Sequence, residues 1–162
     1  MAGALAGMVV VTTTVSWEVT MVAGSAVEIL SEDEAWELLG TRQLGRLATS
    51  VDDQPEIFPI NFYATGGKIY FRTAAGTKLA EIAVNNRLAF EADRTDDTGG
   101  WSVIAKGHAK ILVSTHDIAE ADKLPLHSWV PTLKYDYVEI TVDEISARRF
   151  TFGEEPDRYG NQ

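Results

Sequence analysis

Two short turns between strand-like segments constrain the fold of this chain more than any other feature. Asp52-Asp53-Gln54-Pro55 lies between the segments 45–51 and 56–65, and Gly66-Gly67 lies between 56–65 and 68–73. Turns of this length join antiparallel strands, because two parallel strands need a crossover of a dozen or more residues. A parallel βαβ architecture is therefore excluded.

The remaining segments extend this antiparallel pattern. Strand-like composition over 87–93 and 101–113 predicts two more strands, and segments 135–142 and 145–152 predict a final strand pair. Ser31 and Glu34 have the spacing of a capping box, which predicts a helix that ends at Gly40. Helical spacing recurs over 77–85 and 115–123. These elements together predict an antiparallel barrel with small helical caps.

The two ends of the chain differ from its middle. Residues 1–27 are rich in Ala and Gly and then in Val and Thr, and residues 153–162 form an acidic tail. The first segment is interpreted as a disordered extension, with an extra edge strand or an arm that swaps onto a partner subunit as the alternatives. The folded domain is expected over residues 28–152.

Composition narrows the chemistry that the chain can perform. Of its 162 residues none is cysteine, which removes disulfides, thiolate metal sites and cysteine nucleophiles. Three histidines without helix-turn spacing predict no metal site. A net charge of −10 argues against nucleic acid as a partner. The apolar N-terminal run lacks a preceding basic residue and is broken by Thr12-Thr13-Thr14, so no signal or membrane span is predicted and the cytoplasm is expected.

One segment has the features of a phosphate site. A strand ends at Arg72 and Thr73, a small-residue turn follows, and a helix opens at Thr77 and Lys78. Helix N-termini present free N–H groups, Arg can donate a forked pair of hydrogen bonds, and Lys adds a point charge. The alternative is structural, with Arg72 and Lys78 as solvent-facing charges and Thr77 as an ordinary N-cap.

The order of several short motifs resembles the pyridoxamine 5′-phosphate oxidase-like family of FMN-binding split β-barrels. The matching motifs are G-R-L-A-T from residue 45, P-I-N-F from 59, Y-F-R-T-A-A-G-T-K-L from 70, G-W-S-V from 100 and I-S-A-R-R-F from 145. The resemblance covers roughly residues 28–152. It implies a mainly β fold, a six-stranded antiparallel split β-barrel with short flanking helices, built as a homodimer with the cofactor at the subunit interface.

The same resemblance implies roles for individual residues. The FMN phosphate is expected at Arg72, Thr73, Thr77 and Lys78, and the flavin ring along Pro59, Ile60, Asn61 and Phe62. Trp101 and Ser102 begin the strand through which the partner subunit contributes, and Trp129 and Arg149 fall near the region that covers the ring or substrate. The alternatives are a buried aromatic for Trp129 and a surface ion pair for Arg149.

The implied function is an FMN-dependent oxidoreductase that passes hydride through flavin N5 to or from a small molecule, with no catalytic side chain. The acidic tail lacks the Arg and His residues that grip the substrate phosphate in the pyridoxal-forming enzymes, so that reaction is not expected. One alternative is a reductase that uses the deazaflavin coenzyme F-420, whose polyanionic tail calls for more Lys and Arg. Another is a non-catalytic flavin or haem binder, with His108, His116 or His127 as the axial ligand.

Overall fold

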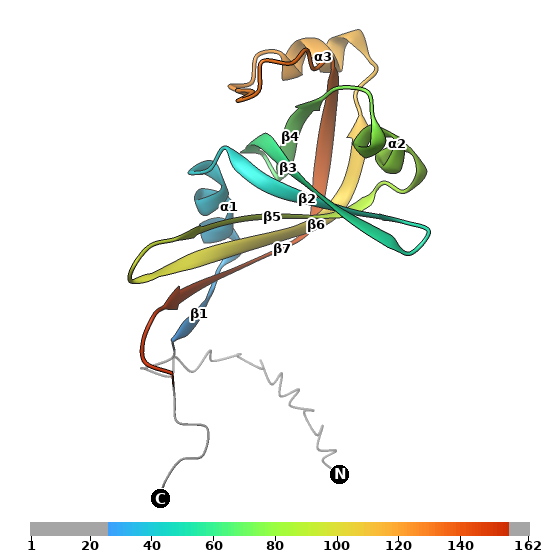
Figure 1. Ribbon diagram of the computed structural model, residues 1–162. Helices are drawn as coiled ribbons and strands as arrows, with labels where there is room; N and C mark the ends of the chain where they lie inside the picture. Colours follow the sequence, from blue (N-terminus) through green and yellow to red (C-terminus); the bar gives the residue numbers. More distant parts are fainter. Residues whose placement is uncertain (1–25, 156–162) are drawn as a thin grey trace, which may run out of the picture.

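A computed structural model describes residues 26–155, which form seven strands and three helices (Figure 1). The strands are β1 (Val27–Leu30), β2 (Leu44–Val51), β3 (Gln54–Thr65), β4 (Lys68–Thr73), β5 (Arg87–Thr95), β6 (Gly99–Ile111) and β7 (Asp136–Thr151). The helices are α1 (Glu32–Gly40), α2 (Thr77–Val84) and α3 (Thr115–Ala121). All strand pairs are antiparallel, which confirms the predicted mainly β fold.

Six of the strands form a ring. The order is β7-β4-β3-β2-β5-β6, and β6 pairs again with β7 to close it. The tight turns that the sequence predicts have the geometry of type I′ hairpins, with φ of 51° and 60° at Asp52 and Asp53 and of 59° and 76° at Gly66 and Gly67. These turns fix the β2–β3 and β3–β4 pairings, and the pairings of β7 with β4 and β6 close the predicted barrel.

Strand β1 lies outside the ring and pairs with the C-terminal half of β7. Val27 therefore belongs to an extra edge strand instead of the extension predicted over residues 1–27. The rest of that prediction, including the swapped arm, concerns residues 1–25, outside the described part of the chain. Most of the predicted acidic tail lies outside it as well.

The predicted final strand pair is wrong, because β7 is one continuous strand of 16 residues. Lys106 faces Glu144 and Gly107 faces Val142, so Asp143 is an extra residue on β7. Such a bulge bends a strand without reversing it. The N-terminal half of β7 consequently pairs with β4 and β6, and its C-terminal half with β6 and β1.

The barrel interior is apolar and the helices cover its openings. Ala35 and Leu39 of α1 and Ile82 of α2 are buried with the inward side chains of the strands in one core cluster. The predicted capping box of α1 is present, since the Ser31 side chain accepts from the Glu34 N–H and the Ser31 N–H donates to the Glu34 carboxylate at 2.8 Å. Helix α3 packs on a second, smaller cluster beyond the end of the barrel.

Candidate functional site at the end of β4

The N-terminus of α2 has no capping side chain. Its N-cap residue is Gly76, and Thr77 is the first helical residue, so the alternative in which Thr77 caps the helix is wrong. The N–H groups of the first turn are therefore left without a side-chain partner, at the positive end of the helix dipole. This arrangement suits an anion.

Three cations without carboxylate partners in the described chain are linked to this helix start: Lys134 acts on the charge of Lys78 and lines the same recess as Arg72. Arg72 at the end of β4, Lys78 in the first turn of α2 and Lys134 before β7 are all half-buried. None of the three takes part in the ion pairs found within residues 26–155. The guanidinium carbon of Arg72 lies 5.8 Å from the Tyr137 ring centroid, and Nζ of Lys78 lies 5.2 Å from that of Phe58. Aromatic faces thus position these two cations without neutralising them.

The environment of Lys78 disfavours its positive charge. Burial lowers the pKa of Lys78, and the nearby charge of Lys134 lowers that pKa further. Both effects would be offset by an anion placed between the two ammonium groups. The site is therefore electrostatically suited to a phosphate.

The irregular segment between α3 and β7, residues 122–135, is attached to the site by hydrogen bonds. We refer to it as the α3–β7 loop. The backbone N–H of Trp129 donates to Oδ1 of Asn61 at 3.1 Å, and Nη2 of Arg72 donates to the Leu126 carbonyl at 3.3 Å. A recess beneath the loop is lined by Asn61, Arg72, Leu126, His127, Ser128 and Lys134. Trp129 itself is 60% exposed, so it is not an ordinary buried aromatic.

Strand β3 divides the four residues predicted along the flavin ring into two pairs. Ile60 and Phe62 are buried in the barrel, where the Phe62 ring packs edge-on against Phe90 at 4.7 Å. Pro59 and Asn61 point outward, and Nδ2 of Asn61 donates to the Gln43 carbonyl at 3.2 Å. Only the outward pair presents side chains to a ligand outside the barrel, and Ile60 and Phe62 can offer backbone groups alone.

Thr73 is turned away from the cation cluster, by which we mean Arg72, Lys78 and Lys134. Its side chain is buried, and its hydroxyl donates to the carbonyl of Ala74 at 3.1 Å. Of the four residues predicted at a phosphate, Arg72, Thr77 and Lys78 thus have side chains that are at least partly accessible.

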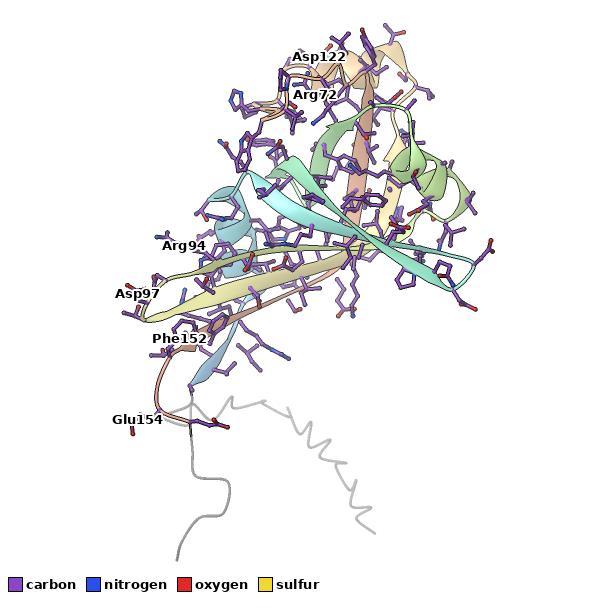
Figure 2. The ribbon with its side chains drawn as sticks, viewed as in Figure 1. Arg72, Arg94, Asp97, Asp122, Phe152 and Glu154 are labelled. Carbon is purple, nitrogen blue, oxygen red and sulfur yellow. The ribbon has the colours of Figure 1, made fainter. Side chains whose placement is uncertain are left out.

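Three further predicted residues lie at the opposite end of the barrel. Trp101 is buried in the core, beside Ser102, and is paired in register with Arg94 on one side and Arg149 on the other. Figure 2 shows Arg94 far from Arg72. Arg149 forms a surface ion pair with Glu28 at 3.0 Å. A contribution of Trp101, Ser102 or Arg149 to the cation cluster would need a second subunit, and it stays a prediction.

The histidines lie on three different elements. His127 lines the recess beside Arg72, while His116 is exposed near the start of α3. Nδ1 of His108 on β6 lies 3.2 Å from the Asp143 carboxylate, which also pairs with Arg87. Among residues 26–155, no three His, Cys, Asp or Glu side chains gather as metal ligands, and no helix is long and apolar enough to cross a membrane.

Lys134, Ser128 and Gln43 were not predicted from the sequence. All three lie in loops whose course is not set by strand or helix periodicity. One signal could have pointed to Lys134. When β4 and β7 are aligned, Arg72 pairs in register with Tyr137, which lies three residues after Lys134 in the sequence. That alignment requires knowing that β7 begins at Asp136 beside β4.

Comparisons with known proteins agree with this architecture. The family model described as pyridoxamine 5′-phosphate oxidase matches residues 31–149. A solved FAD-binding protein from Mycobacterium smegmatis is 44% identical, with a TM-score of 0.69 over 78% of this chain and 100% of that one. A solved Corynebacterium glutamicum protein assigned to the same oxidases is 43% identical, with a TM-score of 0.71 over 80% of this chain and 98% of that one. The uncharacterized Mycobacterium tuberculosis protein Rv3129 is 42% identical over 93 residues, 57% of this chain and 84% of its own length.

Proposed function

Because the chain belongs to the pyridoxamine 5′-phosphate oxidase family, we propose that it is a flavin-dependent oxidoreductase acting on a small molecule. The observation that carries the proposal is the set of unpaired, half-buried cations beside the uncapped start of α2. A phosphate group is the ligand that such a site favours. The FMN unit ends in this group, and FAD contains the same unit.

Each side chain has a definite task in this proposal. Arg72 donates a forked pair of hydrogen bonds to phosphate oxygens, and Lys78 supplies a point charge from the first turn of α2. The hydroxyl of Thr77 adds a donor, and outward-facing Pro59 and Asn61 border the space for the ring. The bound flavin supplies hydride transfer through its N5. The protein binds and orients it, so no side chain needs to act as nucleophile or base.

The relatives favour a flavin over coenzyme F-420 and over haem as the ligand. The 44% identical M. smegmatis protein is described as FAD-binding. Coenzyme F-420 has a long polyanionic tail, for which the cations near α2 are few. A haem would need an axial ligand, and His127 is the histidine that lines the recess beside Arg72.

A homodimer is part of the proposal, and an uncovered face of the barrel supports it. Ile57, Ala48 and Ala89 lie side by side on the outer face of β3, β2 and β5, and the row continues to Lys106 on β6. Ile104 lies on the same face of β6, where it pairs in register with Glu91. Ile57 and Ile104 are 68% and 43% exposed. The apolar strip formed by Ile57, Ala48 and Ala89 on an outer sheet face is typical of a subunit interface.

The direct test is an absorbance spectrum of the purified protein from 300 to 700 nm, before and after flavin is added and removed by gel filtration. Retained flavin bands support the proposal.

Arg72→Ala should weaken flavin binding by about 1.5–3 kcal/mol, the contribution of a charge-assisted hydrogen bond. Arg94→Ala, which removes an exposed arginine far from the site, is the matched control. A protein that retains no flavin, or one whose affinity is unchanged in Arg72→Ala and Lys78→Ala together, contradicts the proposed site.

A further inference from the structure

The α3–β7 loop has little apolar anchorage of its own. In Figure 1 it extends from α3, at the end of the molecule opposite β1. Leu124 and Leu126, near its start, pack against the smaller core cluster, and none of residues 127–135 belongs to either cluster. A segment with few buried apolar contacts opens at a low free-energy cost unless polar contacts hold it. The position of this loop therefore depends on its hydrogen bonds.

Two hydrogen bonds join residues 125–135 to the barrel strands within the described chain. Nη2 of Arg72 donates one to the Leu126 carbonyl, and the backbone N–H of Trp129 donates the other to Oδ1 of Asn61. The other hydrogen bonds of this stretch lie within the loop. Arg72 and Asn61 both border the proposed flavin site, so the loop is held beside that site at two points.

The side-chain amide of Asn61 has a fixed orientation. Its Nδ2 donates to the Gln43 carbonyl at 3.2 Å, and the same carbonyl accepts the backbone N–H of Phe62 at 3.1 Å. A flipped amide would place Oδ1 against this carbonyl and the NH₂ group against the N–H of Trp129, so both contacts would become repulsive. Oδ1 is consequently held toward the loop as an acceptor. The amide has a partner on each side before any ligand binds.

Resting on the proposed flavin site, we infer that Asn61 is a positioning residue that fastens the α3–β7 loop over the flavin ring. The sequence resemblance places Asn61 along the ring itself. The hydrogen bonds give its amide a different task, because they join the turn before β2 to the loop. Trp129 is thereby brought to the border of the ring space. The fastened loop retains the flavin and keeps water from that side of the ring.

The second contact links the order of the loop to flavin binding. The guanidinium of Arg72 has several N–H groups, and one of them holds the Leu126 carbonyl while others are left for the phosphate. A bound phosphate would fix the guanidinium and so strengthen its contact with the loop. By linkage, the fastened loop raises flavin affinity by the same factor by which flavin favours the fastened loop.

The first test needs no flavin. Hydrogen exchange of the Trp129 amide, followed by NMR on the full flavin-free chain, reports its bond to Asn61. Asn61→Ala should speed this exchange about fivefold, the equivalent of one neutral hydrogen bond, and should leave the amides of β5 unchanged. Gln43→Ala is the matched control, because Gln43 contributes its backbone carbonyl to the amide. Unchanged exchange in Asn61→Ala would overturn the inference and leave the proposed flavin site intact.

The second test is a double-mutant cycle with FMN as the probe. Asn61→Ala and Trp129→Ala should each lower FMN affinity about fivefold, and the double variant should lose little more than Trp129→Ala alone. Trp129 at the ring should quench the fluorescence of the bound flavin, so both single variants should fluoresce more strongly than the wild type. Gln43→Ala should change neither affinity nor fluorescence.

The outcomes separate this inference from the proposed function. Additive losses in the double variant would show that Asn61 contacts the flavin itself, which would overturn the inference and support the flavin site. A protein that binds no flavin would overturn the proposed function and the role of the loop together, even where hydrogen exchange shows the contact between Asn61 and Trp129.

Discussion

Lys78 illustrates, at the scale of one residue, how a ligand site costs stability in the empty protein. Its ammonium group is half-buried, faces Lys134 and has no carboxylate partner within the described chain. Burial and the neighbouring charge both disfavour the protonated form of Lys78. The charged Lys78 therefore lowers the free energy of unfolding of the protein as long as no anion is bound. Lys78→Met, which keeps the aliphatic stem, should therefore raise the free energy of unfolding of the flavin-free protein at neutral pH while it weakens flavin binding. Urea denaturation, with the exposed Lys123→Met as control, checks this.

The same residue sets a pH dependence for binding. The pKa of Lys78 in the free protein lies below the ordinary value of 10.5, and a bound phosphate would raise it again. Above the lowered pKa, binding requires uptake of a proton, so flavin affinity should fall as the pH rises toward 10.5. In Lys78→Arg the guanidinium stays charged, and the alkaline decrease should disappear. Identical profiles for the two proteins would show that Lys78 does not contact the phosphate.

The bulge of β7 shows, at the scale of an element, why one glycine is required. A Cβ atom on Gly107 would lie 2.0 Å from the carbonyl oxygen of Thr141, across the β6–β7 pair at the point where the register shifts. The backbone of a paired strand cannot move aside as the end of a flexible side chain can. Gly107→Ala should therefore destabilise the protein by about 1–3 kcal/mol, the usual cost of overpacking. A Cβ on Gly40 would meet nothing within 4 Å, so Gly40→Ala is the control in the same denaturation assay.

Elements that depend on local geometry could be predicted from the sequence, and those that depend on distant contacts could not. The I′ turns at Asp52-Asp53 and Gly66-Gly67 and the cap at Ser31 are fixed by a few neighbouring residues. Asp143-Glu144 is polar, and a polar pair fits a turn as well as a bulge, so the continuity of β7 became visible only through its pairing with β6. The proposed phosphate site at Arg72 and Lys78 could be predicted because its residues are close together in the sequence. Lys134 was missed because it reaches the site through an irregular loop.

At the scale of the whole molecule, the apolar strip on the barrel predicts a dimer. Ile57→Lys places a charge in that strip and should shift the molar mass in light scattering from two chains to one, with an unchanged circular dichroism spectrum. Val113→Lys makes the corresponding change at a β-branched apolar residue that is 83% exposed beyond the end of β6, and it should leave the dimer intact. A wild-type protein that elutes with the mass of one chain would refute the dimer.

The position of β7 also has a consequence for synthesis on the ribosome. β7 pairs with β1, β4 and β6, yet it is the last of the described strands to be translated. Until it emerges, the β2–β6 sheet has free edges on β4 and β6, and the strand with which β1 pairs among the described strands is missing. Free strand edges recruit other chains. A nascent polypeptide that stalls before Asp136 is therefore expected to depend on chaperones, and the barrel can close only after β7 has left the ribosome.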